Sequence, residues 1–151
     1  MQSRRSFLGF LLLGAVAPGA LAGPARVAVE VWKGPRCGCC DDWIRHIEAD
    51  GFSVSRHDTG NQEARTRLGL PVEYGSCHTA RVGGYVIEGH VPARDIRRLL
   101  RERPDAIGLA VPSMPVGSPG MDGTEYRGRK DPFEVLLVRR DGRASVYQAY
   151  R

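Results

Sequence analysis

Hydrophobic and polar residues alternate along several short stretches of the chain, a pattern typical of β-strands with one buried face. The first such stretch places Val27, Val29 and Val31 on one face and ends before Gly34-Pro35. The same period of two recurs further along the chain. The stretches predicted as strands are 27–32, 52–57, 79–82, 85–88, 133–139 and 144–150.

Three stretches between these strands have helical spacing. The first begins among the cysteines at 37–40, carries acids in its first turn and stops at Gly51. The second covers Asn61–Leu68, and the third runs from Pro92 to Pro104. The order of these strands and helices predicts an α/β fold, a thioredoxin-like β-α-β-α-β-β-α core with an added C-terminal β-hairpin. Residues 103–130 form a long Pro/Gly loop without periodicity that joins the predicted core to the C-terminal hairpin. A loop of that length is expected to be functional.

The first 22 residues are typical of an export signal. Arg4 and Arg5 lie in an S-R-R-x-F-L motif, an apolar run follows, and small residues at Ala20 and Ala22 form a cleavage signal. The paired arginines favour the twin-arginine route of bacteria, which carries folded proteins. An uncleaved membrane anchor is the alternative, but the apolar run is about half the roughly 20 residues a span needs. We therefore expect a signal peptide at 1–22, a single domain at 23–151, a periplasmic location and no stable membrane insertion after cleavage.

The charge balance argues against nucleic-acid binding. The chain has 22 Lys and Arg against 17 Asp and Glu, a formal net charge of +5, and its arginines are scattered among acids. They form no basic stripe of the kind that tracks a phosphate backbone. With 42% hydrophobic residues, the chain is also too apolar for a disordered segment.

The four cysteines carry the candidate chemistry. Cys37 and Cys40 form a C-x-x-C pair, and Cys39 places a third thiol inside it. A thiol-disulfide enzyme needs only two of these thiols, whereas three thiolates at a helix N-terminus suit a soft metal such as Cu(I), Zn(II) or an iron-sulfur cluster. Cys77, just before the third strand, is expected to complete the site. Two structural disulfides, 37–40 and 39–77, remain an alternative for an exported chain.

Methionines and histidines provide further candidate ligands. Met114 and Met121 lie in the Pro/Gly loop, either as hydrophobic pegs or as thioether ligands for Cu(I), and if only one is a ligand we expect it to be Met114. His78, next to Cys77, is a candidate ligand or a donor to a ligand. His90 either contributes to the site or braces the third helix, and His46 is expected to have a structural role.

These features together resemble one family, the CopG-like copper-resistance proteins with a CxCC motif, long catalogued as a domain of unknown function. The resemblance rests on CGCCDDW at 37–43, SCHTARVGGYVIEGHVPARDI at 76–96 and GLAVPSMPVGSPGMDG at 108–123. It departs slightly at Ser113 and Asp122, where glycine and glutamate are expected. The resemblance implies a periplasmic, thioredoxin-like protein that binds copper through Cys37, Cys39, Cys40 and Cys77, with Met114 and Met121 as further contributors.

Two functions of different classes follow from this reading. The first is a copper-binding protein that sequesters or handles several Cu(I) ions in a thiolate cluster and exchanges them with other periplasmic copper-handling proteins. The second is an enzyme, a thiol-disulfide or copper oxidoreductase that uses Cys37 and Cys40. The third thiol, Cys39, favours the first function.

Overall fold

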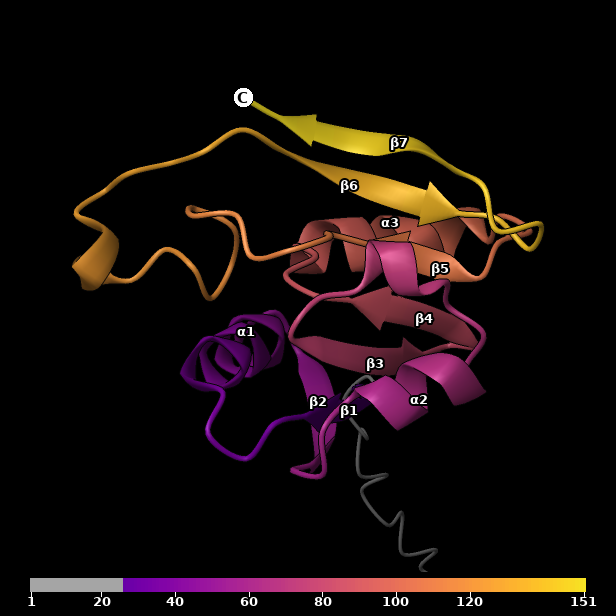
Figure 1. Ribbon diagram of the computed structural model, residues 1–151, viewed down its shortest axis with the longest axis horizontal. Coiled ribbons are helices and arrows are strands. Elements are labelled where there is room, and N and C mark those ends of the chain that lie inside the picture. The colour runs from indigo at the N-terminus through magenta and orange to yellow at the C-terminus, as the bar shows by residue number, and fades with distance from the viewer. Residues whose placement is uncertain (1–25) are drawn as a thin grey trace, which may run out of the picture.

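The polypeptide from residue 26 to residue 151, the part that this computed structural model describes, is built around one mixed β-sheet (Figure 1). The strands are β1 (Val27–Lys33), β2 (Phe52–His57), β3 (His78–Val82), β4 (Tyr85–Glu88), β5 (Gly108–Ala110), β6 (Phe133–Val138) and β7 (Ala144–Tyr150). The α-helices are α1 (Gly38–Ala49), α2 (Gln62–Arg67) and α3 (Ala93–Glu102), and two short 3-10 helices are η1 (Val72–Tyr74) and η2 (Thr124–Tyr126).

The seven strands lie in the order β2-β1-β3-β4-β5-β6-β7. β1 is parallel to β2 and antiparallel to β3, and β3 is antiparallel to β4. β5 then pairs parallel to β4 and antiparallel to β6, so the C-terminal hairpin of β6 and β7 extends the same sheet.

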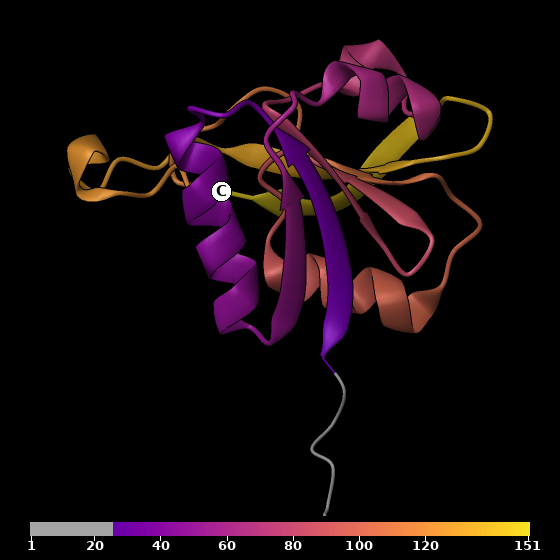
Figure 2. The ribbon, with the colours of Figure 1, turned by 90° about the horizontal axis from the view of Figure 1, so that it is seen from below.

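Hydrophobic side chains cover both faces of the sheet, as the alternation along each strand requires. On one face, Ile87 and Leu109 belong to the larger core together with Trp43 of α1 and Ile96 of α3. On the opposite face, Val86 and its neighbours form a smaller cluster with residues that follow α2. Figure 2 shows α1 and α3 beside the strands and α2 away from both. The sheet therefore lies between two helical layers.

The mixed α/β class and the C-terminal hairpin are confirmed. The prediction of a Pro/Gly loop without any strand is wrong at one point, since β5 occupies Gly108–Ala110 within it. The first helix begins at Gly38 among the cysteines, as expected. The thioredoxin-like assignment stays a prediction, and the predicted export signal at 1–22 lies outside the described residues. Over residues 26–151, no helix has the length and apolar character needed to cross a bilayer.

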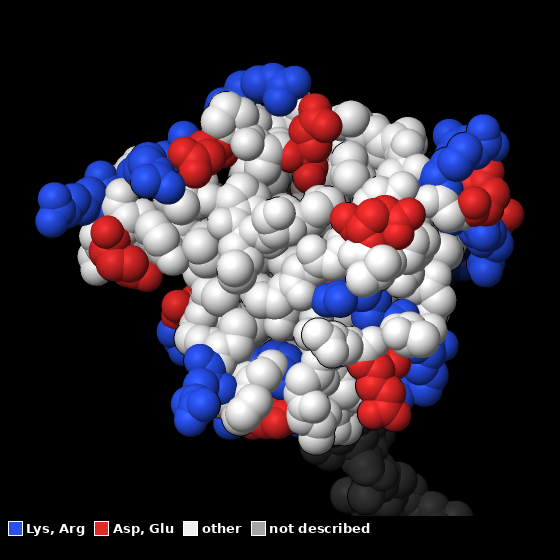
Figure 3. Space-filling view, viewed as in Figure 1, with Lys and Arg blue, Asp and Glu red and all other residues white. Residues whose placement is uncertain are grey.

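The face of the molecule shown in Figure 3 carries positive and negative side chains side by side around a largely uncharged centre. Ion pairs between described residues include Arg98 with Glu102 and Arg143 with Asp141. This face has no continuous basic stripe.

Candidate metal centre

The predicted site residues come together at one end of the sheet because antiparallel strands bring their opposite ends side by side. β1 ends at Lys33, which lies opposite His78 at the start of β3. β4 ends at Glu88, opposite Thr79. The segments that carry the cysteines at 37–40, Cys77 and His90 therefore meet at the same end of the strands.

Ion pairs fix the first turn of α1 against the end of β1. Lys33 is buried, and its Nζ lies 3.1 Å from Asp41 Oδ1 and 3.0 Å from Asp58 Oδ1. Asp41 is in the first turn of α1, where an acid also interacts favourably with the positive end of the helix. The cysteines just before Asp41 are thus held in place by contacts outside their own loop.

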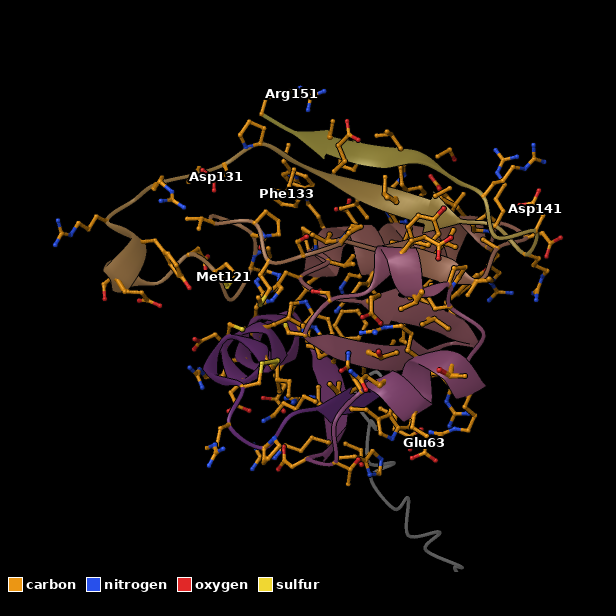
Figure 4. All side chains as sticks on the ribbon, in the orientation of Figure 1. Glu63, Met121, Asp131, Phe133, Asp141 and Arg151 are labelled. Carbon is orange, nitrogen blue, oxygen red and sulfur yellow. A yellow bond between two sulfur atoms is a disulfide. The ribbon has the colours of Figure 1, made fainter. Side chains whose placement is uncertain are left out.

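Cys37 and Cys40 are joined by a disulfide at the start of α1 (Figure 4). Cys39 and Cys77, the other two cysteines, are free thiols. Cys39 Sγ lies 3.6 Å from Cys37 Sγ and 3.9 Å from Cys77 Sγ. The structure contains the first disulfide of the two-disulfide alternative, Cys37–Cys40, whereas Cys39 and Cys77 are close but not bonded.

Cys77 is the point where the sulfur atoms meet two imidazole rings. Its Sγ lies 3.0 Å from His90 Nε2 and 3.4 Å from His78 Nδ1. His90 Nδ1 lies 2.8 Å from the carbonyl oxygen of Pro119, which can only accept a hydrogen bond. The proton of neutral His90 is therefore on Nδ1, and the lone pair of Nε2 faces the thiol of Cys77.

His78 is fully buried against Trp43, with ring centroids 4.3 Å apart. Its Nε2 has no hydrogen-bond partner among the described residues. Buried polar atoms without a partner are uncommon and cost free energy. The ring is thus held in place by packing, and its Nδ1 lies toward Cys77.

Burial shifts the pKa values of Cys77, His78 and His90 against their charged forms. It raises the pKa of the Cys77 thiol to about 12, and the neighbouring Cys39 adds to the rise. It lowers the pKa of His78 well below the ordinary value, with a further contribution from His90, and it lowers the pKa of His90. Both imidazoles are therefore neutral near pH 7 and free to bind a cation, and a metal that binds Cys77 must displace its proton.

The Pro/Gly loop packs directly on the start of α1. Gly120 has a φ of +85°, and a Cβ there would lie 2.5 Å from the carbonyl oxygen of Cys39. Met121 follows on the stretch of loop close to α1 (Figure 4), and its sulfur accepts a hydrogen bond from the Tyr126 hydroxyl. Met114 is 49% exposed, which does not fit a buried hydrophobic peg.

The structure brings together five of the seven predicted site residues. Among residues 26–151, two clusters could hold a metal ion, each with ligand atoms within 4.8 Å of one another. They are Cys37, Cys39, Cys40 and Cys77, and Cys77, His78 and His90. Met114 and Met121 belong to neither cluster.

The sequence left the place of His90 open, and the structure places it against Cys77. The brace of the third helix is instead His46, whose Nε2 accepts a hydrogen bond from the backbone N–H of Ala93, 3.1 Å away. Pro119 and its carbonyl oxygen were not among the predicted residues. No local signal in the sequence marks a carbonyl that orients a histidine 29 residues away.

The donor atoms fit a soft or borderline metal. Four sulfur atoms are characteristic ligands for Cu(I) and Zn(II), and neutral imidazoles suit copper in either oxidation state. The orphaned Nε2 of His78 also fits a histidine that has another role besides packing. The disulfide between Cys37 and Cys40 must be reduced before all four sulfur atoms can bind a metal.

Comparison with known proteins identifies the family. The solved structure named copper resistance protein CopG, Form 2, is 48% identical, with a TM-score of 0.76, and the match covers 84% of this chain and all of that chain. Form 1 of the same protein is also 48% identical, with 83% and 98% covered and the same TM-score. The family described as "Protein of unknown function, DUF411" matches residues 74–121. No curated protein sequence matches. The chain belongs to the CopG family of copper resistance proteins.

Proposed function

We propose that this protein binds copper as Cu(I) through the thiolates of Cys37, Cys39, Cys40 and Cys77, and that it does so in the bacterial periplasm. The observation that carries the proposal is the meeting of four cysteine sulfurs, from two segments of the chain, within 4.8 Å of one another. The copper resistance name of its relatives supports the same metal.

Thiolates shared between ions explain the third thiol. Three cysteines within four residues do not easily surround one ion alone, whereas Cu(I) readily accepts bridging thiolates. We therefore propose more than one Cu(I) ion per chain. His78 and His90 would bind next to Cys77, and Met121 is a thioether candidate because it follows Gly120, which packs against the Cys39 carbonyl.

The proposed location and partners are based on the export signal predicted at residues 1–22. The twin-arginine motif at residues 4 and 5 supports export of the folded protein. Copper-handling proteins of the periplasm are the partners that would supply or accept its copper.

The test is Cu(I) binding to fully reduced protein under anaerobic conditions, with thiol counting on the same sample. The parent should bind more than one Cu(I) per chain and release it to a strong chelator. Cys39→Ser should abolish or strongly reduce binding, and after reoxidation its Cys37 and Cys40 should still form their disulfide. Full copper loading of Cys39→Ser would overturn the proposed cluster.

The disulfide itself favours a second candidate function, an oxidoreductase that uses Cys37 and Cys40. Reduction of that disulfide takes up two electrons and two protons, and oxidation of two Cu(I) ions to Cu(II) supplies two electrons. Mixing the disulfide form with Cu(I) anaerobically should then produce two new thiols and a Cu(II) electron paramagnetic resonance signal. Copper uptake by the reduced protein, with no such signal from the disulfide form, favours binding alone.

A further inference from the structure

A buried ion pair lies under α2, on the opposite face of the sheet from α1. Glu88, the last residue of β4, is fully buried, and Arg65 of α2 is almost so. Arg65 donates to the same carboxylate oxygen, Glu88 Oε1, from Nε at 3.0 Å and from Nη2 at 2.7 Å. Neither residue belongs to the clusters of candidate metal ligands.

Both charged groups also hold the backbone next to Cys77. The N–H of Ser76 donates to Glu88 Oε1 at 2.7 Å, and the carbonyl of Ser76 accepts from Arg65 Nη2 at 2.7 Å. Two residues beyond Cys77, the hydroxyl of Thr79 donates to Glu88 Oε2 at 2.6 Å. The ion pair is therefore hydrogen-bonded to the chain on both sides of Cys77.

These hydrogen bonds take the place of the strand pairing that residues 76 and 77 lack. β3 begins at His78, so Ser76 and Cys77 lie outside the regular ladder of the sheet. Asn61 Nδ2 gives the only other donor to the Ser76 carbonyl among the described residues, at 3.1 Å. Within the described part of the chain, Glu88 is the sole hydrogen-bond partner of the Ser76 N–H, whereas the Ser76 carbonyl would keep Asn61 if Arg65 were lost.

A buried ion pair contributes little to the free energy of folding compared with apolar side chains. Removing a carboxylate and a guanidinium from water is costly, and apolar residues of the same volume often stabilise a core equally well. Such a pair does fix geometry, because a guanidinium fork and a carboxylate accept few relative orientations. What it fixes here is the segment that carries Cys77.

We propose that Glu88 and Arg65 are positioning residues that hold the sulfur of Cys77 at its distance from Cys39 and His90. This inference rests on the proposed copper function, since it names the residues that set the shape of that site. The distances at stake are 3.9 Å from Cys77 Sγ to Cys39 Sγ and 3.0 Å to His90 Nε2.

The first measurement needs no metal. Reduced, metal-free protein is treated with iodoacetamide, and the alkylation rate of each cysteine is followed by mass spectrometry. Cys39 and Cys77 of the parent are both partly buried, so the ratio of their alkylation rates is the quantity to compare between variants. In Glu88→Ala the ratio of the Cys77 rate to the Cys39 rate should rise about tenfold or more, because the charged hydrogen bonds that keep the segment closed are lost.

Conservative variants and a matched control separate positioning from general destabilisation. Glu88→Gln keeps an acceptor for the Ser76 N–H, and Arg65→Lys keeps the charge but loses the fork, so both should give a smaller rise. Asp95→Asn removes another buried carboxylate, on α3, which accepts a hydrogen bond from the hydroxyl of Tyr150 at the end of β7. This control should lower stability without changing the ratio of the two alkylation rates.

The second measurement is competition for Cu(I) with a chelator. Glu88→Ala should lose copper at about tenfold less chelator than the parent, with Glu88→Gln in between, and Asp95→Asn should match the parent. If Glu88→Ala does not fold, Glu88→Gln and Arg65→Lys carry both measurements. Unchanged alkylation ratios in every Glu88 and Arg65 variant would overturn the proposal. If the parent binds no Cu(I), the proposed function fails, whereas the alkylation ratios still decide whether the pair positions Cys77.

Discussion

Replacing Gly120 by alanine tests whether the Pro/Gly loop is part of the site or merely lies near it. Gly120 has a φ of +85°, in the region that side chains other than glycine rarely adopt. A Cβ there would lie 2.5 Å from the Cys39 carbonyl oxygen and 2.8 Å from the Trp43 nitrogen. Both are backbone atoms of α1 and cannot turn aside as a flexible side chain would, so the loop itself must move away from the helix.

The cost of Gly120→Ala has two parts. The positive φ costs roughly 1 kcal/mol for a residue with a Cβ. Movement of the loop also weakens the hydrogen bond between His90 and the Pro119 carbonyl, 2.8 Å long, and an unsatisfied buried group costs about 1–3 kcal/mol. We therefore expect a loss of about 2–4 kcal/mol in the free energy of unfolding.

Gly128→Ala is the matched control, because Gly128 lies in the same loop with a φ of +75° and has open space around its Cβ position. It should cost about 1 kcal/mol from the backbone alone. Urea unfolding of the reduced, metal-free proteins measures both, provided that the slope of the free energy against urea is the same. Equal costs for the two substitutions would refute the packing argument. Gly120→Ala should also release Cu(I) to a chelator more readily, since Pro119 orients His90.

Three other substitutions probe the surroundings. Burial lowers the pKa of His46, so the unfolded state takes up the proton first, and the free energy of unfolding should fall as the pH drops below about 6.5. His46→Gln should reduce this pH dependence. Equal losses of unfolding free energy between pH 7.5 and 5.5 in the variant and the parent would contradict it. Met121→Leu should weaken Cu(I) retention more than Met114→Leu, each costing less than about 1.5 kcal/mol of stability; retention equal to the parent in both would make the thioethers structural. Cys77→Ser should lower the copper count and leave the melting temperature of the metal-free protein nearly unchanged, and a collapse in stability would instead favour a structural disulfide.

Periodicity in the sequence predicts most of the sheet but not β5. Strands such as β1 and β7 are long enough for alternation to show, and their ends agree with the prediction to within a residue or so. β5 has three residues and begins at Gly108, where a Cβ would lie 1.7 Å from the Val86 carbonyl oxygen. Its place between β4 and β6 is set by neighbours far away in the chain, so a local pattern could not reveal it.

The cysteines of the site were predictable, whereas their support was not. The C-x-C-C spacing and the position of Cys77 before a strand are local features, and the fold order brings them to one edge. Glu88 reads in the sequence as an ordinary charged residue at the end of a strand, and Arg65 as an ordinary helix residue. Only the packing of α2 on the sheet shows that the two are buried together.

The separation of the site residues along the chain bears on when the site forms. Cys39 and Cys77 are 38 residues apart and His90 and Pro119 are 29 apart, so the contacts that bring the separate segments of the site together are non-local. Contacts between residues far apart in the sequence form late in folding, because closing a long loop costs entropy first. A nascent chain that has emerged only as far as β4 already contains all four thiols, but it has neither the oriented imidazole of His90 nor the loop against α1. We expect such a chain to hold Cu(I) loosely and the finished domain to hold it tightly, which would make retention of the metal a report on the completion of folding.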